Sequence, residues 1–159
     1  MNNYFLKALN QENEAPYIPV WLLRQAGRYM PEYREVRSQY KDFFEMIKKP
    51  EICKELTLQP LNAFDLDAAI TFTDILTIPD ALGLKVNFVK GKGPIFEKSL
   101  SSMDKLDLNT NEFHDKIQYV YSATSLIKEN VNVPLIGFTG SPWTLFVYMF
   151  YGQSPKDFK

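Results

Sequence analysis

Four arginines lie within residues 24–37, and the chain has no others. They fall in the stretch PVWLLRQAGRYMPEYREVR (19–37), at Arg24, Arg28, Arg34 and Arg37. A guanidinium group is planar and permanently charged, and it binds a carboxylate through two parallel hydrogen bonds that lysine cannot reproduce. The cluster therefore suits a ligand with several carboxylates, and Gly27 indicates a tight turn or a close backbone approach beside it. The alternative is a set of salt bridges with Glu32 and Glu35.

Asp74 is the second candidate, because it directly follows the apolar stretch DAAITFT (67–73). A carboxylate sheltered from water needs hydrogen-bond donors or a cationic partner, since burial of an unpaired charge is costly. The position also fits an N-cap for the next short helix, and that alternative stays open. Asp80, in IPDALG, lies in the first turn of that helix and is interpreted as a structural acid.

A third group of polar residues follows the apolar stretch VPLIGFT (133–139). Ser141 is in position to cap a helix whose first residue is Pro142. Tyr148 lies about two turns into that helix. Taken alone, a tyrosine in this setting is more often a core aromatic with a satisfied hydroxyl than a catalytic group.

The composition excludes several classes of protein. A length of 159 residues with 45% hydrophobic and 23% charged residues is typical of one soluble globular domain, and a net charge of -1 gives no general attraction for nucleic acid or an anionic membrane. The single cysteine, Cys53, and the single histidine, His114, exclude an internal disulfide and a Cys/His metal site. Cys53 is interpreted as a buried apolar group and His114 as a solvated helix residue. Neither a signal peptide nor a membrane-spanning run is evident, which indicates a cytoplasmic protein.

The elements that must position these residues follow from the apolar pattern. Strands are predicted at 17–23, 67–73 and 133–139, helices at 31–40, 50–64 and 111–130, and a β-hairpin at 85–100. The strand stretches do not alternate polar and apolar residues, so both faces are expected to be buried, as in a parallel sheet covered by helices. The glycines of the hairpin lack the spacing of a phosphate-binding loop.

The order of these elements is that of a β/α fold. In such folds, functional residues gather at the carboxyl ends of the strands. The loop that carries Arg24 and Arg28, called the arginine loop below, lies at such an end, and so do Asp74 and the segment around Ser141. A closed (β/α)8 barrel needs eight strands and typically about 250 residues. We therefore expect residues 1–159 to be the N-terminal portion of a single barrel domain, apparently truncated, with about three β/α units and a β-hairpin insertion.

Three motifs resemble those of a known family and follow one another in the same order along the chain. PVWLLRQAGRYMPEYREVR closely resembles the N-terminal motif of the uroporphyrinogen decarboxylase family, and AAITFTDILTIPDALGL and GFTGSPWTLFVYM resemble the next two, with Ser141 where many relatives have alanine. The match covers less than half of a typical member. The resemblance implies an α/β fold of the (β/α)8 TIM-barrel type. It also implies a carboxy-lyase of porphyrin and haem biosynthesis, which converts uroporphyrinogen III to coproporphyrinogen III by decarboxylating its four acetate side chains.

The same resemblance implies roles for individual residues. The substrate-binding set is Arg24, Gln25, Ala26, Gly27, Arg28, Arg37, Asp74 and Tyr148. Asp74 is implied to accept the pyrrole N–H groups and stabilise a cationic intermediate, Arg24 is a candidate proton donor, and Tyr148 lies near the reacting ring. No metal or organic cofactor is implied, because the protonated pyrrole accepts the electrons. Members commonly form homodimers, and the only other partner implied is the small-molecule substrate.

Two alternative functions remain at this point. One is a related barrel methyltransferase that handles corrinoid-bound methyl groups, which would use zinc and a different first loop. The intact RQAGRYM and the lack of local His/Cys ligands argue against it. The other is an inactive or porphyrinogen-binding fragment.

Overall fold

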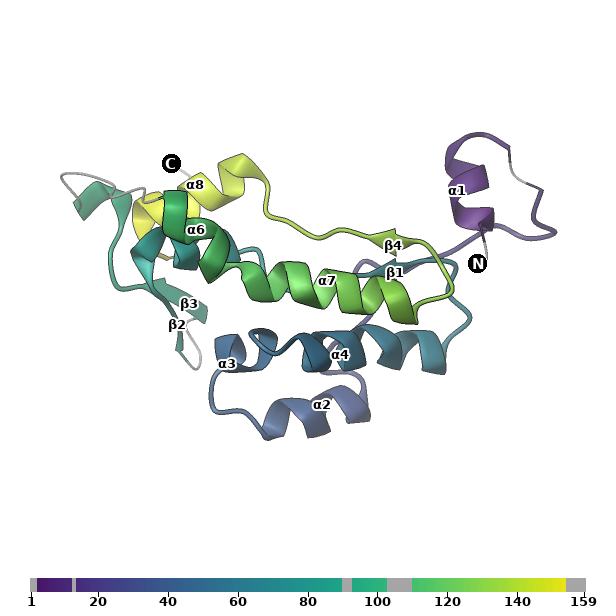
Figure 1. The fold of residues 1–159 in the computed structure, drawn as a ribbon, viewed down its shortest axis with the longest axis horizontal. Helices are drawn as coiled ribbons and strands as arrows, with labels where there is room; N and C mark the ends of the chain where they lie inside the picture. Colours follow the sequence, from purple (N-terminus) through teal and green to yellow (C-terminus); the bar gives the residue numbers. More distant parts are fainter. Residues whose placement is uncertain (1–2, 13, 90–92, 103–109, 154–159) are drawn as a thin grey trace. The chain divides into compact units, whose positions relative to one another are not determined.

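The chain folds into two compact units in the computed structural model, which describes residues 3–12, 14–89, 93–102 and 110–153. The first unit comprises Met1–Thr73 and Tyr119–Phe138, and the second comprises Asp74–Gln118 and Thr139–Lys159. Figure 1 labels most of the helices and strands of both units and colours them along the chain.

A short parallel pair of strands forms the sheet of the first unit. Strand β1 (Ala69–Ile70) pairs with β4 (Leu135–Ile136), with Ala69 opposite Leu135. The strands predicted at 67–73 and 133–139 are therefore confirmed in location, and their pairing is parallel as expected, although each regular strand is shorter than predicted. The alanine at the start of β1 is fully buried, as the apolar pattern indicated.

The strand predicted at 17–23 is wrong, because this segment has no regular strand structure. Pro19 has no N–H group to donate to a ladder. The carbonyl of Val20 accepts a hydrogen bond from the N–H of Asp67 at 2.9 Å. The side chains of Ile18 and Leu23 are 82% and 70% exposed, so the expectation that both faces are buried also fails here.

Five described helices belong wholly or almost wholly to the first unit. They are α1 (Tyr4–Leu9), α2 (Pro31–Ser38), α3 (Phe43–Ile47), α4 (Pro50–Ala63) and α7 (Gln118–Asn130). The predicted helices 31–40 and 50–64 are confirmed as α2 and α4, and each begins with a proline at its first position, where the missing N–H costs nothing. Figure 1 shows α2 and α3 beside α4.

The core of the first unit forms where these helices face one another and the strands. In α2 the buried side chains are Tyr33 and Val36, one turn apart, which gives the helix a single apolar face. Met46 of α3, Leu56 of α4 and Ile127 of α7 are fully buried. Burial of such side chains supplies the main stabilising free energy of the unit.

The second unit contains the predicted hairpin. Strands β2 (Val86–Val89) and β3 (Gly93–Phe96) are antiparallel, with Val86 opposite Phe96. The predicted turn glycine at 91 lies outside the described residues. The hairpin is preceded by α5 (Thr77–Pro79) and by the π-type turn η1 (Asp80–Leu84).

The remaining elements of the second unit are η2 (Leu100–Ser102), α6 (Thr110–Lys116) and α8 (Pro142–Tyr151). The single helix predicted at 111–130 is wrong in one respect, because the structure has α6 and α7 with a break at Ile117. Gly152 ends α8 in the left-handed conformation, with a φ angle of +71°. Its carbonyl accepts a hydrogen bond from the N–H of Phe96 at 2.8 Å. The end of α8 is therefore attached to β3.

Candidate functional site

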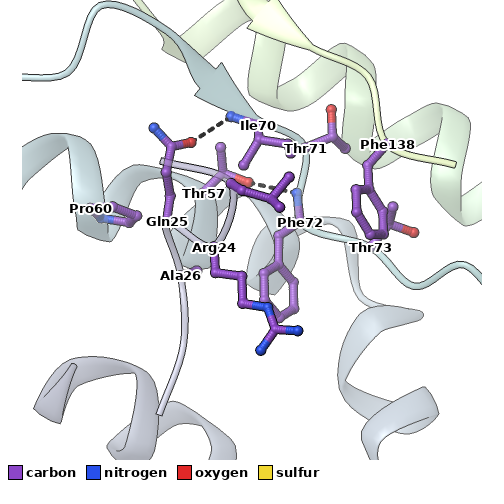
Figure 2. A pocket seen from close by; sticks show the side chains of 11 residues that line it. Arg24, Gln25, Ala26, Thr57, Pro60, Ile70, Thr71, Phe72, Thr73 and Phe138 are labelled. Atoms are coloured by element: carbon purple, nitrogen blue, oxygen red, sulfur yellow. Dashed lines mark hydrogen bonds between the residues drawn. The ribbon is translucent and has the colours of Figure 1, made fainter. Parts of the chain in front are cut away.

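A pocket of about 310 Å³ opens beside β1 in the first unit (Figure 2). Its lining residues come from the arginine loop, from α4 and from the segments that follow β1 and β4: Leu23, Arg24, Gln25, Ala26, Thr57, Pro60, Ile70, Thr71, Phe72, Thr73 and Phe138. Most of these side chains are apolar or weakly polar, and Arg24 is the charged one. The pocket therefore offers apolar walls with a cation, which suits an apolar ring that carries a carboxylate.

Arg24 and Arg28 are the exposed cations of the arginine loop. Among the residues that the structure describes, neither guanidinium group has a hydrogen bond or an ion pair, and the ion pairs found there involve Lys7, Lys85 and Lys116. The alternative in which the arginines form salt bridges with Glu32 and Glu35 is therefore wrong for the described part of the chain.

Arg34 and Arg37 bond to the backbone instead. The Nη1 of Arg34 donates to the carbonyl of Arg28 at 2.7 Å and to that of Tyr29 at 3.1 Å. The Nη1 of Arg37 donates to the carbonyl of Tyr40 at 2.6 Å. Arg34 therefore holds the loop that carries Arg28.

Tyr33 shows that two of the cations share one neighbourhood. Burial raises the pKa of its hydroxyl, and the positive charges of Arg37 and Arg28 partly oppose that shift. Arg28 and Arg37 are thus close enough to act on the same phenol. Neither of them is among the residues that line the pocket.

Gly27 lies in the turn that the sequence indicated, since its carbonyl accepts the N–H of Met30 at 3.0 Å. Its φ angle is not in the left-handed region. The turn itself therefore does not require glycine at this position.

Gln25 differs from its neighbours because it is buried, with 3% of its surface exposed. Its Nε2 donates to the carbonyl of Ala68 at 2.7 Å, and its Oε1 accepts the N–H of Ile70 at 2.9 Å. Figure 2 shows the carboxamide turned toward Ile70, whereas the side chain of Arg24 extends in a different direction.

Sequence reasoning missed two polar residues that support this loop and the pocket wall. Asp67 is buried, and its carboxylate accepts the hydroxyl of Tyr17 at 2.7 Å and the N–H of Val20 at 2.9 Å. Thr57, in α4, accepts the N–H of Phe72 at 3.1 Å. The position of Asp67 at the start of an apolar stretch was the available signal, since a buried carboxylate there requires donors.

Asp74 belongs to the second unit, where its carboxylate begins the turn that leads into α5. Its Oδ1 accepts the N–H of Leu76 at 2.8 Å, and its carbonyl accepts the N–H of Thr77 at 3.4 Å. Burial raises the pKa of this carboxyl, and the bond from Leu76 partly offsets the rise. The N-cap alternative is wrong, because Leu76 is the N-cap of α5 and no side-chain hydrogen bond caps this helix, whereas Asp74 is sheltered as expected.

Asp80 is confirmed as a structural acid, since its Oδ1 accepts the N–H of Val86 at 3.3 Å.

Tyr148 is half-buried in α8. The predicted helix start at Pro142 is confirmed, but the predicted cap is wrong, because the side chain of Ser141 makes no capping hydrogen bond. Gly140 has a steric reason to be glycine, since a Cβ atom there would lie 2.6 Å from Cδ2 of Leu145. The glycine therefore lets Leu145 pack against the segment that precedes the helix.

Cys53 and His114 have the environments that were predicted. Cys53 is 2% exposed, its Sγ donates to the carbonyl of Ile47, and burial raises the pKa of the thiol to about 12. His114 lies exposed on α6. Within the described ranges, no group of three or more His, Cys, Asp or Glu residues could hold a metal ion. No helix in the same ranges is long and apolar enough to cross a membrane.

The fold resembles that of a known enzyme structure. A methyltransferase from Methanosarcina mazei matches with a TM-score of 0.64 at 20% sequence identity, over 94% of this chain and 44% of that one. At this identity the likeness defines the α/β fold class only.

Sequence comparison then gives the family. The family model described as uroporphyrinogen decarboxylase (URO-D) matches residues 1–159, so the chain belongs to the uroporphyrinogen decarboxylase family. The uroporphyrinogen decarboxylase of Francisella tularensis subsp. novicida is 47% identical over 99% of this chain and 46% of its own length. That of Vibrio campbellii is 49% identical over 99% of this chain and 45% of its own. The chain thus spans less than half the length of these curated relatives.

Proposed function

We propose that residues 1–159 form the N-terminal part of a single (β/α)8 barrel domain that decarboxylates the four acetate side chains of uroporphyrinogen III and releases coproporphyrinogen III. Membership of the family and the names of the relatives support the reaction class. The parallel β1/β4 pair, with α4 packed on β1, is what the first units of such a barrel require.

The observation that carries the proposal is the cation at the pocket. Arg24 lines a largely apolar pocket, and its guanidinium has no partner among the described residues. The substrate has the complementary chemistry, because its pyrrole rings are apolar and its eight side chains are carboxylates. The guanidinium of Arg24 would bind one carboxylate bidentately, while Arg28 and Arg37 would bind others.

In this proposal Asp74 is the central catalytic group. The four pyrrole N–H groups of the folded macrocycle donate to its carboxylate, which stabilises the cation that forms when a pyrrole carbon is protonated. The C–CO₂⁻ bond then breaks, and its electron pair neutralises the cation and leaves an exocyclic methylene group. A proton adds to this methylene to form the methyl group, and the proton on the ring carbon leaves to restore the pyrrole. A carboxylate that is already desolvated and oriented by the N–H of Leu76 is preorganised for this task.

Further parts of the proposal come from the family resemblance. Tyr148 lies near the reacting ring, Arg24 is a candidate proton donor, and Ala26 and Gly27 bring the backbone of the loop close to the substrate. The substrate itself accepts the electrons, so the reaction proceeds without a metal or an organic cofactor. The whole protein is proposed to be a cytoplasmic homodimer that binds neither nucleic acid nor membrane.

The decisive experiment uses the chain extended to the full length of its relatives. Asp74→Ala should lower kcat for coproporphyrinogen formation by at least about 100-fold, because it removes the group that stabilises the cation. Asp115→Ala, which removes an exposed carboxylate of α6, is the matched control and should keep the parental rate. Near-parental turnover by the Asp74 variant, measured by chromatography of the products, would rule out this role.

One observation favours a second candidate, since the structural neighbour is called a methyltransferase. A corrinoid-dependent methyltransferase would use zinc and would transfer a methyl group from the cobalt of a methylated corrinoid to a nucleophile such as a thiolate. The same extended protein should therefore be assayed with methylcobalamin and a thiol acceptor after loading with zinc. Methyl transfer in the absence of any decarboxylation would favour this candidate over the first.

A further inference from the structure

We propose that the side-chain carboxamide of Gln25 is a positioning group that takes the place of a missing strand residue and fixes the backbone from which Arg24 reaches the pocket. This inference rests on the proposed function, because it assigns Arg24 to ligand binding. It also gives a different role to Gln25, which the family resemblance placed in the substrate-binding set. The inference depends on five hydrogen bonds and on the burial of two polar side chains.

The two bonds of Gln25 have the pattern of a parallel sheet. In a parallel pair, a residue on one strand forms two hydrogen bonds with the neighbouring strand. Its N–H donates to the carbonyl of one residue there, and its C=O accepts the N–H of the residue two positions further on, so the two bonds lie on either side of a single residue. Gln25 Nε2 donates to the carbonyl of Ala68 and Gln25 Oε1 accepts the N–H of Ile70, so the flanked residue is Ala69. A carboxamide has the same donor and acceptor as a peptide group.

The location of these bonds fits the same interpretation. The N–H of Ala69 and that of Thr71 point toward β4, where they donate to Pro134 and Ile136. Because alternate residues of a strand direct their backbone groups to opposite edges, Ala68 and Ile70 face the other edge. An unpaired edge beside a buried strand leaves polar groups unsatisfied, and the carboxamide of Gln25 satisfies two of them.

Asp67 fastens the same segment at a second point. Its carboxylate accepts the N–H of Val20 and the hydroxyl of Tyr17, while its own N–H donates to the carbonyl of Val20. Residues 17–25 are therefore attached to residues 67–70 near both of their ends, by four side-chain hydrogen bonds and one backbone hydrogen bond rather than by a strand ladder. We call this arrangement the loop clamp, formed by Gln25 and Asp67.

The loop clamp acts on Arg24 because Arg24 is joined directly to Gln25. An arginine side chain has several rotatable bonds, so its guanidinium group reaches a defined place only if its backbone is fixed. Both polar atoms of Gln25 are occupied by the backbone of 68–70, and 3% of the residue is exposed. Nε2 uses one of its two N–H groups in the bond to Ala68, and burial keeps the other away from solvent, whereas the exposed guanidinium group of Arg24 has several donors for a carboxylate.

The test uses the whole 159-residue chain and uroporphyrin, the stable oxidised octacarboxylate, as a fluorescent binding probe. Gln25→Met keeps the length and burial of the side chain but removes both hydrogen bonds. It should raise the Kd for uroporphyrin by about 10-fold and accelerate hydrogen exchange at the Ile70 amide by about 10-fold or more. Gln39→Met, at an exposed glutamine after α2, is the control and should change neither quantity.

A double-mutant cycle separates positioning from general stability. Arg24→Lys should weaken binding strongly in the parent chain but only slightly in the Gln25→Met background, because the guanidinium is already misplaced there. Equal effects of Arg24→Lys in the two backgrounds would overturn the proposal. If Gln25→Met fails to fold, Gln25→Glu keeps the acceptor for Ile70 and loses the donor to Ala68, and the same cycle is run with it.

The remaining outcomes are also decisive. Weaker binding with unchanged exchange at Ile70 would mean that Gln25 contacts the ligand directly, and faster exchange with unchanged binding would mean that it only stabilises the strand. Either result overturns the proposal. Failure of the parent chain to bind uroporphyrin would count against the proposed substrate site, while the exchange rate at Ile70 would still report whether the bonds of Gln25 exist. The two failures are thus distinguishable.

Discussion

Asp67 and Asp74 are two sheltered carboxylates whose donors differ. The carboxylate of Asp67 accepts one hydrogen bond from a hydroxyl and another from a backbone N–H. That of Asp74 accepts one from Leu76, and burial is the largest influence on its pKa, which lies above the ordinary value of 3.8. Burial therefore makes this carboxyl harder to ionise than an exposed one. Asp74 is thus a source of pH-dependent stability.

The pH dependence has a definite sign. The pKa of Asp74 is higher in the folded protein than in the unfolded chain, so the folded state binds the proton more tightly. The free energy of unfolding therefore falls as the pH rises from 3.8 through the pKa of Asp74 in the folded protein. Asp74→Asn cannot ionise, so its stability relative to the parent should rise across that interval. Urea unfolding at several pH values measures the difference. A difference in the free energy of unfolding between Asp74→Asn and the parent that stays constant with pH would contradict the raised pKa of Asp74. Asp115→Asn is the control for the loss of a negative charge.

The arginine cluster gives a prediction about ligand geometry. Arg24→Lys keeps the positive charge but loses the planar fork, so it should weaken uroporphyrin binding by about 10-fold, and Arg24→Ala should weaken it further. The salt dependence of binding should decrease for the alanine variant only. Lys128→Ala removes an exposed cation of α7 and should leave the Kd unchanged. Fluorescence titration at two salt concentrations measures all four proteins, and equal affinities for the parent and Arg24→Ala would contradict this role.

At the scale of elements, Thr57 joins α4 to the segment after β1. Its hydroxyl accepts the N–H of Phe72 and donates to the carbonyl of Cys53 within the helix. Thr57→Val has nearly the same shape but leaves the N–H of Phe72 without its acceptor, which should lower the free energy of unfolding by about 1–2 kcal/mol.

Thr124→Val is the matched control for Thr57→Val. The hydroxyl of Thr124 donates only to the carbonyl of Val120 in its own helix, so its loss leaves no N–H group unsatisfied. Thr57→Ser, which keeps the hydroxyl, should lose less stability than Thr57→Val. Urea denaturation measures the differences, and equal losses for Thr57→Val and Thr124→Val would show that the bond to Phe72 contributes nothing.

The elements also show which parts of the fold the sequence could specify. Helices α2 and α4 were predictable because each begins with a proline and places buried residues at helical spacing. Residues 17–23 have the composition of a strand, but their fold depends on the side chain of Asp67, which is distant in sequence. Local composition cannot report that a side chain replaces a ladder. The break at Ile117 likewise has no proline or glycine to mark it.

The candidate site was predictable to a similar degree. Residue type and spacing pointed to the cluster of four arginines, and the family resemblance singled out Arg24, which lines the pocket. The same reasoning could not separate Arg34, which bonds to the carbonyls of Arg28 and Tyr29, because that difference arises from the path of the backbone. The hydrogen bonds of Gln25 and Asp67 could not be predicted for the same reason, since their partners come from another segment of the chain.

At the scale of the whole molecule, the chain matches less than half the length of its curated relatives, and β1 and β4 form a two-stranded sheet. A barrel closes only when each strand has two neighbours, and the carboxyl ends of all eight strands contribute to its active site. The 159 residues alone should therefore not turn over uroporphyrinogen III, although the pocket beside Arg24 should still bind a polycarboxylate weakly.

Anaerobic incubation of the purified chain with uroporphyrinogen, followed by chromatography for coproporphyrinogen, measures this directly. The chain extended to the length of its relatives is the positive control. Robust turnover by the 159 residues would show that a complete barrel is unnecessary for the reaction, and the assignment of this chain to the N-terminal part of a larger catalytic domain would then fail.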